Sequence, residues 1–443
     1  PRRPACRGAR VRSAQRLPPH PAAPLRAAFT LVAVLVASAA AAEPPRDAPA
    51  IVRAFPSFAR VPRIGLVTKA SPLEPLGALE QRLRGELGGG ARTAGWLWVK
   101  RDDVSEGFVG GNKARKLEFL LGEAKAAGAR GVITSGRLGT NLGLPAALAA
   151  SRLGLRATVV LAPQPVSETV RRKLLALHAA GAEMRVHSTL AGAILDVVWL
   201  RLQAALRPEQ RLYYIPPSGT SALGSLGYVN AFFELLEQTG DERLPDEIVV
   251  ASSTGGTAAG LIAGTCLSGR WERTRIRAVT VTDSWLQGEW LLRREARDAF
   301  RAARDTLDAA DRARAVECDF MGSSSALTYV RGYLAPGYGR GDAELDAVMR
   351  LARETQGLEL DVTFSAKAMR HYLDRARERL RSGDTRRPLL FWNTYAPLDL
   401  ESVIAAHAWT DPVAPWRDLP EGFHWMFRPA APIRTAAAPS AAR

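Results

Sequence analysis

Between residues 96 and 282, short runs of β-branched and other apolar residues alternate with longer segments in which apolar positions recur every three or four residues. The short runs predict buried strands, and the longer segments predict helices with one apolar face. Strands that alternate with helices are typical of a mostly parallel sheet covered on both faces. The strands are expected at 96–100, 131–134, 157–161, 182–186, 212–215, 247–252 and 275–282, and the helices at 116–127, 142–153, 170–180, 191–206, 222–238 and from 257.

Before residue 96 and after residue 282, the pattern of apolar and polar positions is weaker. Residues 43–95 are rich in proline and glycine, which predicts an irregular entry into the fold. Residues 284–310 predict mostly helix, and further helices are expected at 344–355 and 367–381 before a last strand at 388–393. The proline- and alanine-rich residues 429–443 predict a disordered tail.

The first 42 residues have the organisation of a secretory signal peptide. Basic residues come first, an apolar run follows at 27–36, and small residues lead to a cleavage site expected near Ala42. This pattern predicts export, to a periplasm or outside the cell, with an organelle transit peptide or a cytoplasmic protein as alternatives. No later segment is long and apolar enough to predict stable membrane insertion of the mature chain.

Charge and cysteine content narrow the classes of function. The formal net charge is +16, but seven arginines lie in residues 1–42, which contain no acidic residue, so the rest of the chain carries +9. The sequence has no block of like charges and no run of basic residues interleaved with aromatic ones, so a nucleic-acid partner is not expected. An anionic substrate or a phosphate is a simpler explanation of the positive charge. Cys6, Cys266 and Cys318 show no metal-binding spacing. A disulfide between the last two is left open.

The most informative stretch is Gly110, Gly111, Asn112, Lys113, Ala114, Arg115 and Lys116. Two glycines lead into a lysine where a helix is expected to begin, and glycine lets the backbone approach a ligand closely. Lys113 and Lys116 are three residues apart and therefore share a helix face. A lysine amine can react with an aldehyde if burial or a second cation lowers its pKa.

A second glycine-rich turn lies more than a hundred residues further on. Ser252, Ser253, Thr254, Gly255 and Gly256 follow a predicted strand and open a helix. Backbone N–H groups and the positive helix end meet at such a turn, which suits a phosphate dianion. Taken alone, the turn is equally well explained as a plain connector.

Together these stretches resemble one enzyme family. Lys100, Arg101, Asp102 and Asp103, followed by residues 110–121, are similar to the 1-aminocyclopropane-1-carboxylate deaminase and D-cysteine desulfhydrase family, and the similarity extends from about residue 60 to about residue 394. The resemblance implies the tryptophan synthase β-like α/β fold: two open, mostly parallel lobes within 43–428, the smaller at roughly 130–230. It also implies pyridoxal 5'-phosphate between the lobes, a small amino-acid substrate and a homodimer.

The resemblance also assigns roles to individual positions. Lys113 would carry the cofactor and serve as the base, Thr140 would hold the substrate carboxylate, and Tyr338 would assist proton transfer beside the substrate. Asn141 would hydrogen-bond the ring hydroxyl of the cofactor, and Ser365 would face its pyridine nitrogen. The remaining cofactor-binding positions are Asn112, Lys116, Ser253, Thr254, Gly255, Gly256 and Thr257.

Four places depart from the family pattern. Arg137 replaces a smaller residue, Leu142 replaces a histidine, Phe364 replaces a tyrosine, and the turn at 393–396 lacks a histidine and two glycines. The hydroxyl of Ser365, in place of a carboxylate, favours a neutral pyridine ring and therefore α,β-elimination, which releases ammonia and a 2-oxo acid. The alternatives are an impaired cofactor- or amino-acid-binding protein, and a racemase or β-replacement enzyme on the same fold.

Overall fold

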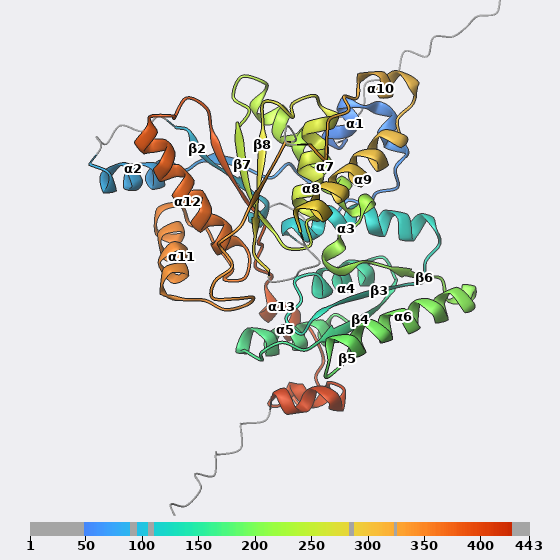
Figure 1. The fold of residues 1–443 in the computed structure, drawn as a ribbon. Helices are drawn as coiled ribbons and strands as arrows, with labels where there is room; N and C mark the ends of the chain where they lie inside the picture. Colours follow the sequence, from blue (N-terminus) through green and yellow to red (C-terminus); the bar gives the residue numbers. More distant parts are fainter. Residues whose placement is uncertain (1–47, 89–94, 105–109, 283–287, 323–325, 428–443) are drawn as a thin grey trace, which may run out of the picture. The chain divides into compact units, whose positions relative to one another are not determined.

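The computed structural model describes residues 48–88, 95–104, 110–282, 288–322 and 326–427. Within these ranges it contains two sheets (Figure 1). The six-stranded sheet is parallel except for its first edge strand, and the four-stranded sheet is entirely parallel. The strand order is β1 (Leu73–Pro75), β2 (Leu97–Arg101), β10 (Leu389–Asn393), β7 (Glu247–Ser252), β8 (Arg275–Thr280) and β9 (Leu327–Val330) in the larger sheet, and β5 (Glu183–Val186), β4 (Arg156–Ala162), β3 (Gly131–Arg137) and β6 (Leu212–Tyr214) in the smaller.

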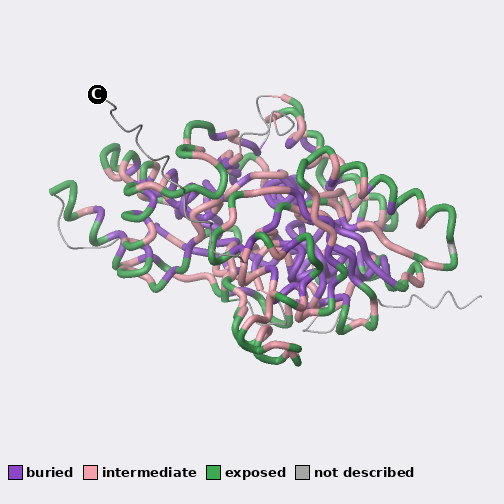
Figure 2. The backbone as a smooth tube through the Cα atoms, turned by 90° about the horizontal axis from the view of Figure 1, so that it is seen from below, coloured by how far each residue is buried: buried purple, intermediate pink, exposed green. Residues whose placement is uncertain are grey.

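Helices cover both faces of each sheet. In the larger sheet, alternate residues of β7 enter two different cores. Ile248 and Val250 pack toward α7 (Ala222–Thr239), α8 (Gly256–Leu267) and α9 (Glu289–Asp305). Val249 packs toward α2 (Gly77–Glu86), α11 (Ala343–Gln356) and α12 (Ser365–Ser382). Figure 2 shows buried segments in the interior and exposed ones around the outside. The helices are α1 (Ala50–Ala54), α2 (Gly77–Glu86), α3 (Gly111–Ala126), α4 (Gly143–Arg152), α5 (Glu168–Ala179), α6 (Leu190–Leu206), α7 (Ala222–Thr239), α8 (Gly256–Leu267), α9 (Glu289–Asp305), α10 (Ala309–Arg314), α11 (Ala343–Gln356), α12 (Ser365–Ser382) and α13 (Leu400–Ala405).

Most expected elements from 96 to 393 are found with boundaries that differ by a few residues. Helix α3 begins five residues before its expected start, at Gly111, since its first turn contains polar residues that hide the apolar periodicity. The expectation of an irregular segment at 43–95 is wrong, because α1, β1 and α2 lie there. The short strand β9 was not expected. The predicted signal peptide and the predicted tail lie outside the described residues.

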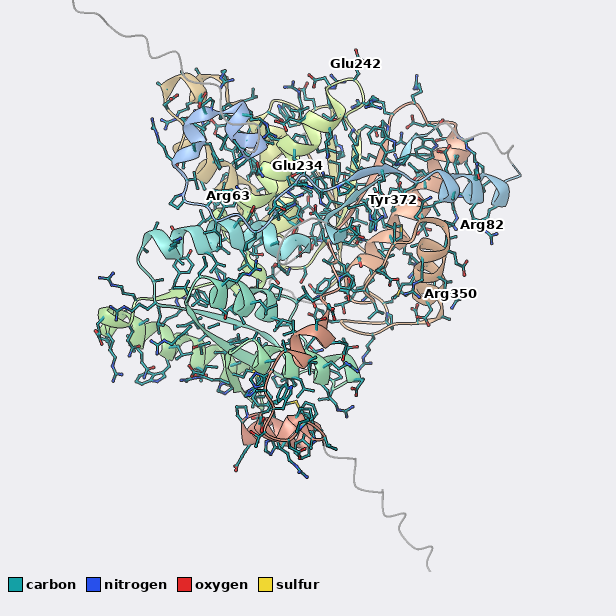
Figure 3. The ribbon with its side chains drawn as sticks, turned by 180° about the vertical axis from the view of Figure 1, so that it is seen from behind. Arg63, Arg82, Glu234, Glu242, Arg350 and Tyr372 are labelled. Carbon is teal, nitrogen blue, oxygen red and sulfur yellow. A yellow bond between two sulfur atoms is a disulfide. The ribbon has the colours of Figure 1, made fainter. Side chains whose placement is uncertain are left out.

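A buried ionic cluster fixes the first turns of α3. Arg115 donates to Glu234 Oε2 at 2.9 Å and to Asp102 Oδ1 at 2.8 Å, and Lys100 donates to Glu234 Oε1 at 2.6 Å. Burial alone would raise the pKa of Glu234, but Arg115 and Lys100 lower it to about 2. Figure 3 shows Glu234 in the interior. Because charged groups without partners are costly in a protein interior, this cluster holds the helix that carries Lys113 in one orientation.

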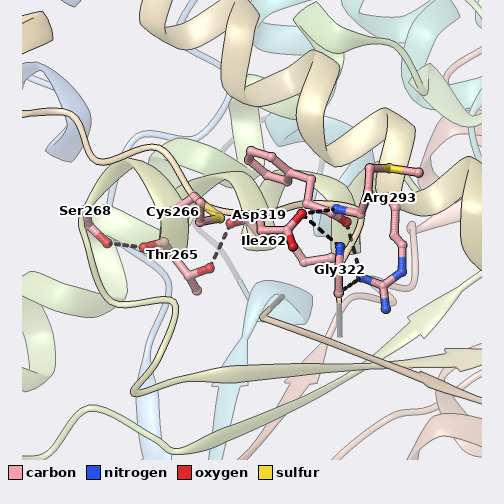
Figure 4. Close-up of a disulfide and its surroundings, with 10 residues drawn as sticks. Ile262, Thr265, Cys266, Ser268, Arg293, Asp319 and Gly322 are labelled. Carbon is pink, nitrogen blue, oxygen red and sulfur yellow. Dashed lines mark hydrogen bonds between the residues drawn. A yellow bond between two sulfur atoms is a disulfide. The ribbon is translucent and has the colours of Figure 1, made fainter. Parts of the chain in front are cut away.

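Cys266 and Cys318, whose pairing the sequence left open, form a disulfide. Cys266 lies in the last turn of α8, and Cys318 lies 52 residues later, with 5.6 Å between the Cα atoms. Figure 4 shows the surroundings, where Arg293 donates to the carbonyl oxygen of Gly322. Among the described helices, none has the length and apolar character required to cross a membrane.

Candidate active site

One pocket gathers the segments that the sequence singled out. They follow the carboxyl ends of β2, β3, β7 and β10, where parallel α/β sheets bind their ligands. The pocket region contains about 1020 Å³ of space not filled by protein atoms, including the part open to solvent. Its lining consists of Gly110, Gly111, Asn112, Lys113, Lys116, Thr140, Asn141, Leu144, Pro145, Thr169, Lys173, Ser218, Ala251, Ser253, Thr254, Gly255, Gly256, Thr257, Asp361, Phe364, Thr394, Tyr395, Ala396, Leu398 and Leu400.

Lys113 lies on the pocket wall, in the first turn of α3. Gly111 has φ +72°, and a Cβ atom there would lie 2.8 Å from the carbonyl oxygen of Thr394. The same oxygen accepts the N–H of Asn112 at 3.1 Å, so the turn after β10 packs directly against the start of α3. Burial lowers the pKa of Lys113 to about 8, although the carboxylate of Asp361 partly opposes the shift. A substantial fraction of this amine is therefore unprotonated near neutral pH.

Lys116 points to a different part of the pocket. Its Nζ lies 3.4 Å from the carbonyl oxygen of Ser218 and 3.5 Å from Thr220 Oγ1. Burial and the neighbouring Lys113 lower its pKa well below the usual value, while Glu295 opposes the shift. An anion bound beside this amine would compensate the cost of burying it as a cation.

The glycine-rich turn forms the N-terminus of α8, next to Lys116. Gly255 has φ +86°, a left-handed conformation that other residues seldom adopt. A Cβ atom on Gly256 would lie 2.7 Å from Thr220 Oγ1 and 2.9 Å from Lys116 Nζ. Thr254 Oγ1 lies 2.6 Å from Thr220 Oγ1. The turn thus brings together backbone N–H groups, two hydroxyls and the amine of Lys116, which are groups that bind phosphate, and leaves no room for a side chain at Gly256.

The loop after β3 is shaped by its own hydrogen bonds. Thr140 Oγ1 accepts the N–H groups of Leu142 and Gly143, each at 3.2 Å, and so caps the start of α4. Asn141 Oδ1 accepts a hydrogen bond from Lys173. The side chain of Leu142 is 2% exposed and packs in the hydrophobic core. The histidine-to-leucine departure therefore removes a polar group without placing an apolar one in the pocket.

Two predicted site residues do not line the pocket. Ser365 is 1% exposed, and its Oγ donates to Asp361 Oδ1 at 2.7 Å. Tyr338 packs edge-on against Phe364, with 5.7 Å between the ring centroids. Asp361 and Phe364 are thus the residues that separate this pair from the pocket space. Asn112, by contrast, lines the pocket and donates to Thr257 Oγ1 at 3.2 Å.

Sequence reasoning did not select Asp361 or Lys173 for the site. Asp361 Oδ2 accepts the N–H groups of Thr363 and Phe364, which orients the carboxylate at the start of α12. Its position four residues before Ser365, just ahead of a predicted helix, is a capping signal that could have drawn attention to it. Lys173 lies in the middle of α5, and nothing in its local pattern indicates a pocket residue.

Comparisons with known proteins agree with this geometry. The family described as "Pyridoxal-phosphate dependent enzyme" matches residues 68–387. D-cysteine desulfhydrase of Serratia proteamaculans is 32% identical over 76% of this chain and 94% of that protein. D-cysteine desulfhydrase of Klebsiella pneumoniae is 31% identical over 72% and 89%.

Solved structures give the same result. An ACC deaminase homologue superimposes with a TM-score of 0.60 and 29% identity over 77% of this chain and 94% of that chain. O-acetyl serine sulfhydrylase isoform 3 of Entamoeba histolytica matches with a TM-score of 0.50 and 14% identity over 77% and 94%, which supports the fold alone.

The chain belongs to the pyridoxal-phosphate-dependent enzymes of the tryptophan synthase β-like fold. Within them it groups with the D-cysteine desulfhydrases and the ACC deaminase homologue, so it is a lyase or deaminase that uses pyridoxal 5'-phosphate. The residues present suit this cofactor: Lys113 has an amine of lowered pKa, and at the glycine turn that opens α8, Lys116 Nζ and the hydroxyls of Thr220 and Thr254 lie close together.

Proposed function

We propose that the protein catalyses α,β-elimination of a small amino acid with a β-leaving group, D-cysteine being the first candidate. The observation that carries the proposal is Lys113, an amine of lowered pKa in a pocket that is also lined by the glycine turn at the N-terminus of α8. The curated relatives are named for this activity. With D-cysteine and water, the products are sulfide, ammonia and a three-carbon 2-oxo acid.

The division of labour follows the positions of the side chains. Lys113 would hold the cofactor and, once released by the substrate, take the proton from Cα. Lys116 and the N–H groups that open α8 would hold the phosphate, and the amide of Asn141 would face the cofactor ring. When bound, pyridoxal phosphate supplies the electron sink for the pair left at Cα. Tyr338, which packs against Phe364 outside the pocket lining, would assist proton transfer.

The choice of elimination rests on the position of Ser365. Its hydroxyl is neutral and donates to Asp361 Oδ1 from behind the pocket wall, so the role that the resemblance gives it, facing the pyridine nitrogen, stays part of the proposal. A neutral ring environment leaves a weaker electron sink, so that a good β-leaving group becomes important. We therefore expect D-cysteine and β-chloro-D-alanine to react faster than 1-aminocyclopropane-1-carboxylate, which has no such group.

Purified protein with cofactor should be given D- and L-cysteine, β-chloro-D-alanine and the cyclopropane substrate while 2-oxo acid and ammonia are measured. Release of both products with a β-leaving group, and its loss in Lys113→Ala, is the expected result. Equal or faster deamination of the cyclopropane substrate would contradict the role given to Ser365. Cofactor binding without any product would contradict the enzyme proposal.

We also infer that the mature protein is exported. The buried pair Cys266 and Cys318 supports this, because disulfides persist mainly in oxidising compartments. In protein isolated from its native cells without reductant, both cysteines should resist maleimide until they are reduced, and the mature chain should begin near residue 43. Two free thiols on a cytoplasmic protein would contradict the proposal.

We propose further that the protein is a homodimer and that a second copy covers α6. The exposed side of this helix presents large apolar side chains that are 47% to 70% exposed: Leu190, Ile194, Leu195, Val198, Trp199, Leu202 and Leu206. Together they expose roughly 700 Å², close to the ~800 Å² that one partner buries in a standard interface. Neighbouring surface would supply the remainder, and a face almost free of charge is complementary to its own copy.

Sedimentation velocity provides the test. The unmodified protein should sediment as a dimer, Leu195→Glu as a monomer, and Gln203→Glu, on another side of α6, again as a dimer. A monomeric unmodified protein would contradict the proposal.

A further inference from the structure

The pocket contains one more basic side chain than the cofactor requires. Among the residues that the structure describes, Lys113, Lys116 and Lys173 are the basic groups on its wall. Lys113 is the cofactor lysine of the proposed function, and Lys116 faces the phosphate turn. Lys173 therefore has no assigned ligand, although it is a cation in a site where burial is costly.

Lys173 is fixed by neutral oxygen atoms. Its Nζ donates to the carbonyl oxygen of Gly139 at 3.2 Å and to Asn141 Oδ1. Within the described ranges, no carboxylate forms an ion pair with it, and Asp361 acts on it only at longer range. An ammonium group has three hydrogens, so these two bonds leave one hydrogen and the full charge for a ligand.

The neighbouring loop offers little else to an anion. The N–H groups of Leu142 and Gly143, which would be open donors at the start of α4, are both bonded to Thr140 Oγ1. Thr140 and the amide nitrogen of Asn141 are neutral donors. Leu144, Pro145 and Leu398 make other parts of the wall apolar.

We propose that Lys173 is the residue that binds the carboxylate of the amino-acid substrate, with Thr140 and Asn141 supporting it. The inference rests on the proposed function in one respect, that the substrate is an amino acid. Every amino acid brings a carboxylate into the pocket, and Lys173 is the pocket cation that remains to neutralise it. Lys173 would then make the main contact with the substrate carboxylate, which the resemblance assigned to Thr140.

The test measures binding of alanine, which has no β-leaving group, and of alanine methyl ester, which has no carboxylate. Each enantiomer is titrated into the cofactor-loaded protein, and the change in the visible spectrum gives a dissociation constant without turnover. Unmodified protein should bind alanine at least about 10-fold more tightly than its ester, since a charged hydrogen bond contributes that much. Lys173→Met should lose most of this preference, Lys173→Arg should keep most of it, and Lys125→Met, an exposed charge control on α3, should keep it all.

Three results would overturn the inference. In the first, Lys173→Met weakens alanine and the ester equally, which would mean that Lys173 acts only by orienting Asn141. In the second, the unmodified protein does not prefer the acid over the ester. In the third, neither alanine enantiomer changes the spectrum. A Lys173-dependent preference in a protein that releases no sulfide or 2-oxo acid would sink the proposed function and leave this inference standing.

Discussion

The pKa of Lys113 gives the most quantitative prediction. A lysine with its ordinary pKa of 10.5 has about one free amine in three thousand molecules at pH 7, whereas a pKa of about 8 gives about one in ten. The site should therefore contain about 300-fold more reactive amine than an exposed lysine does. The capture of pyridoxal phosphate by cofactor-free protein should rise with pH and level off above about pH 8, because only the unprotonated amine attacks the aldehyde.

The assay follows the visible absorbance of the bound cofactor after rapid mixing, from pH 6 to pH 11. Dividing each rate by that of N-acetyl-lysine, extrapolated to its unprotonated form, removes the titration of the cofactor itself. Asp361→Asn should move the midpoint below 8, since the carboxylate raises the pKa of Lys113. Lys116→Ala should leave the midpoint near 8 and weaken cofactor binding, and Lys113→Ala should abolish capture.

Two outcomes would refute this reasoning. A corrected rate that continues to rise toward pH 10.5 would mean that burial does not lower the pKa of Lys113. Absorbance that survives Lys113→Ala and disappears in Lys116→Ala would mean that the cofactor lysine is misassigned within the motif.

Three further predictions concern the cofactor site and stability. Gly256→Val should weaken cofactor binding at least about 10-fold, because its side chain would displace Thr220 and Lys116 at the proposed phosphate site. Gly85→Ala, in open space on α2, should leave the affinity unchanged. Equal affinities of Gly256→Val and the unmodified protein would place the phosphate site elsewhere. Glu234→Gln should lower the free energy of unfolding, measured in urea, by about 3–5 kcal/mol, because it leaves buried cations unpaired. Glu237→Gln, in an exposed ion pair on the same helix, should cost under about 1 kcal/mol. Similar losses in the two variants would show that the buried ionic cluster around Glu234 is not stabilising. Burial lowers the pKa of His371 to about 4. In the unfolded chain this histidine therefore binds a proton at a higher pH than in the folded protein, and the free energy of unfolding should fall by about 2 kcal/mol from pH 7 to pH 5. His371→Gln should remove that part of the dependence of stability on pH, and an unchanged dependence would show that the histidine is not responsible.

Much of the candidate site could be predicted because its parts are contiguous in sequence. The residues from Gly110 to Lys116 and from Ser253 to Thr257 are continuous motifs, each placed where a strand gives way to a helix. Local periodicity also determined the parallel α/β class, since buried strands and amphipathic helices repeat in order. The elements that were missed include α1, β1, α2, β9 and α13, which are short or interrupted by proline and glycine, so their periodicity is weak.

The tertiary structure decided which distant residues meet. The last strand, β10, inserts between β2 and β7, and this places Thr394 against Gly111. Neither the position of β10 between these two strands nor the contact of Thr394 with Gly111 can be predicted from the local sequence pattern. The same applies to Asp361, which reaches the pocket from the segment before α12, and to Lys173, which reaches it from α5.

Half of the motif around Lys113 also turned out to be structural. Lys100 and Arg115 pair with Glu234, which lies more than a hundred residues away, and Arg115 also pairs with Asp102. Local sequence sets propensity and periodicity, whereas burial, pKa and the pairing of charges depend on neighbours that only the folded chain brings together. The sequence thus determined the fold class and singled out Lys113 as a candidate, and the packing of distant segments decided the environment of that lysine.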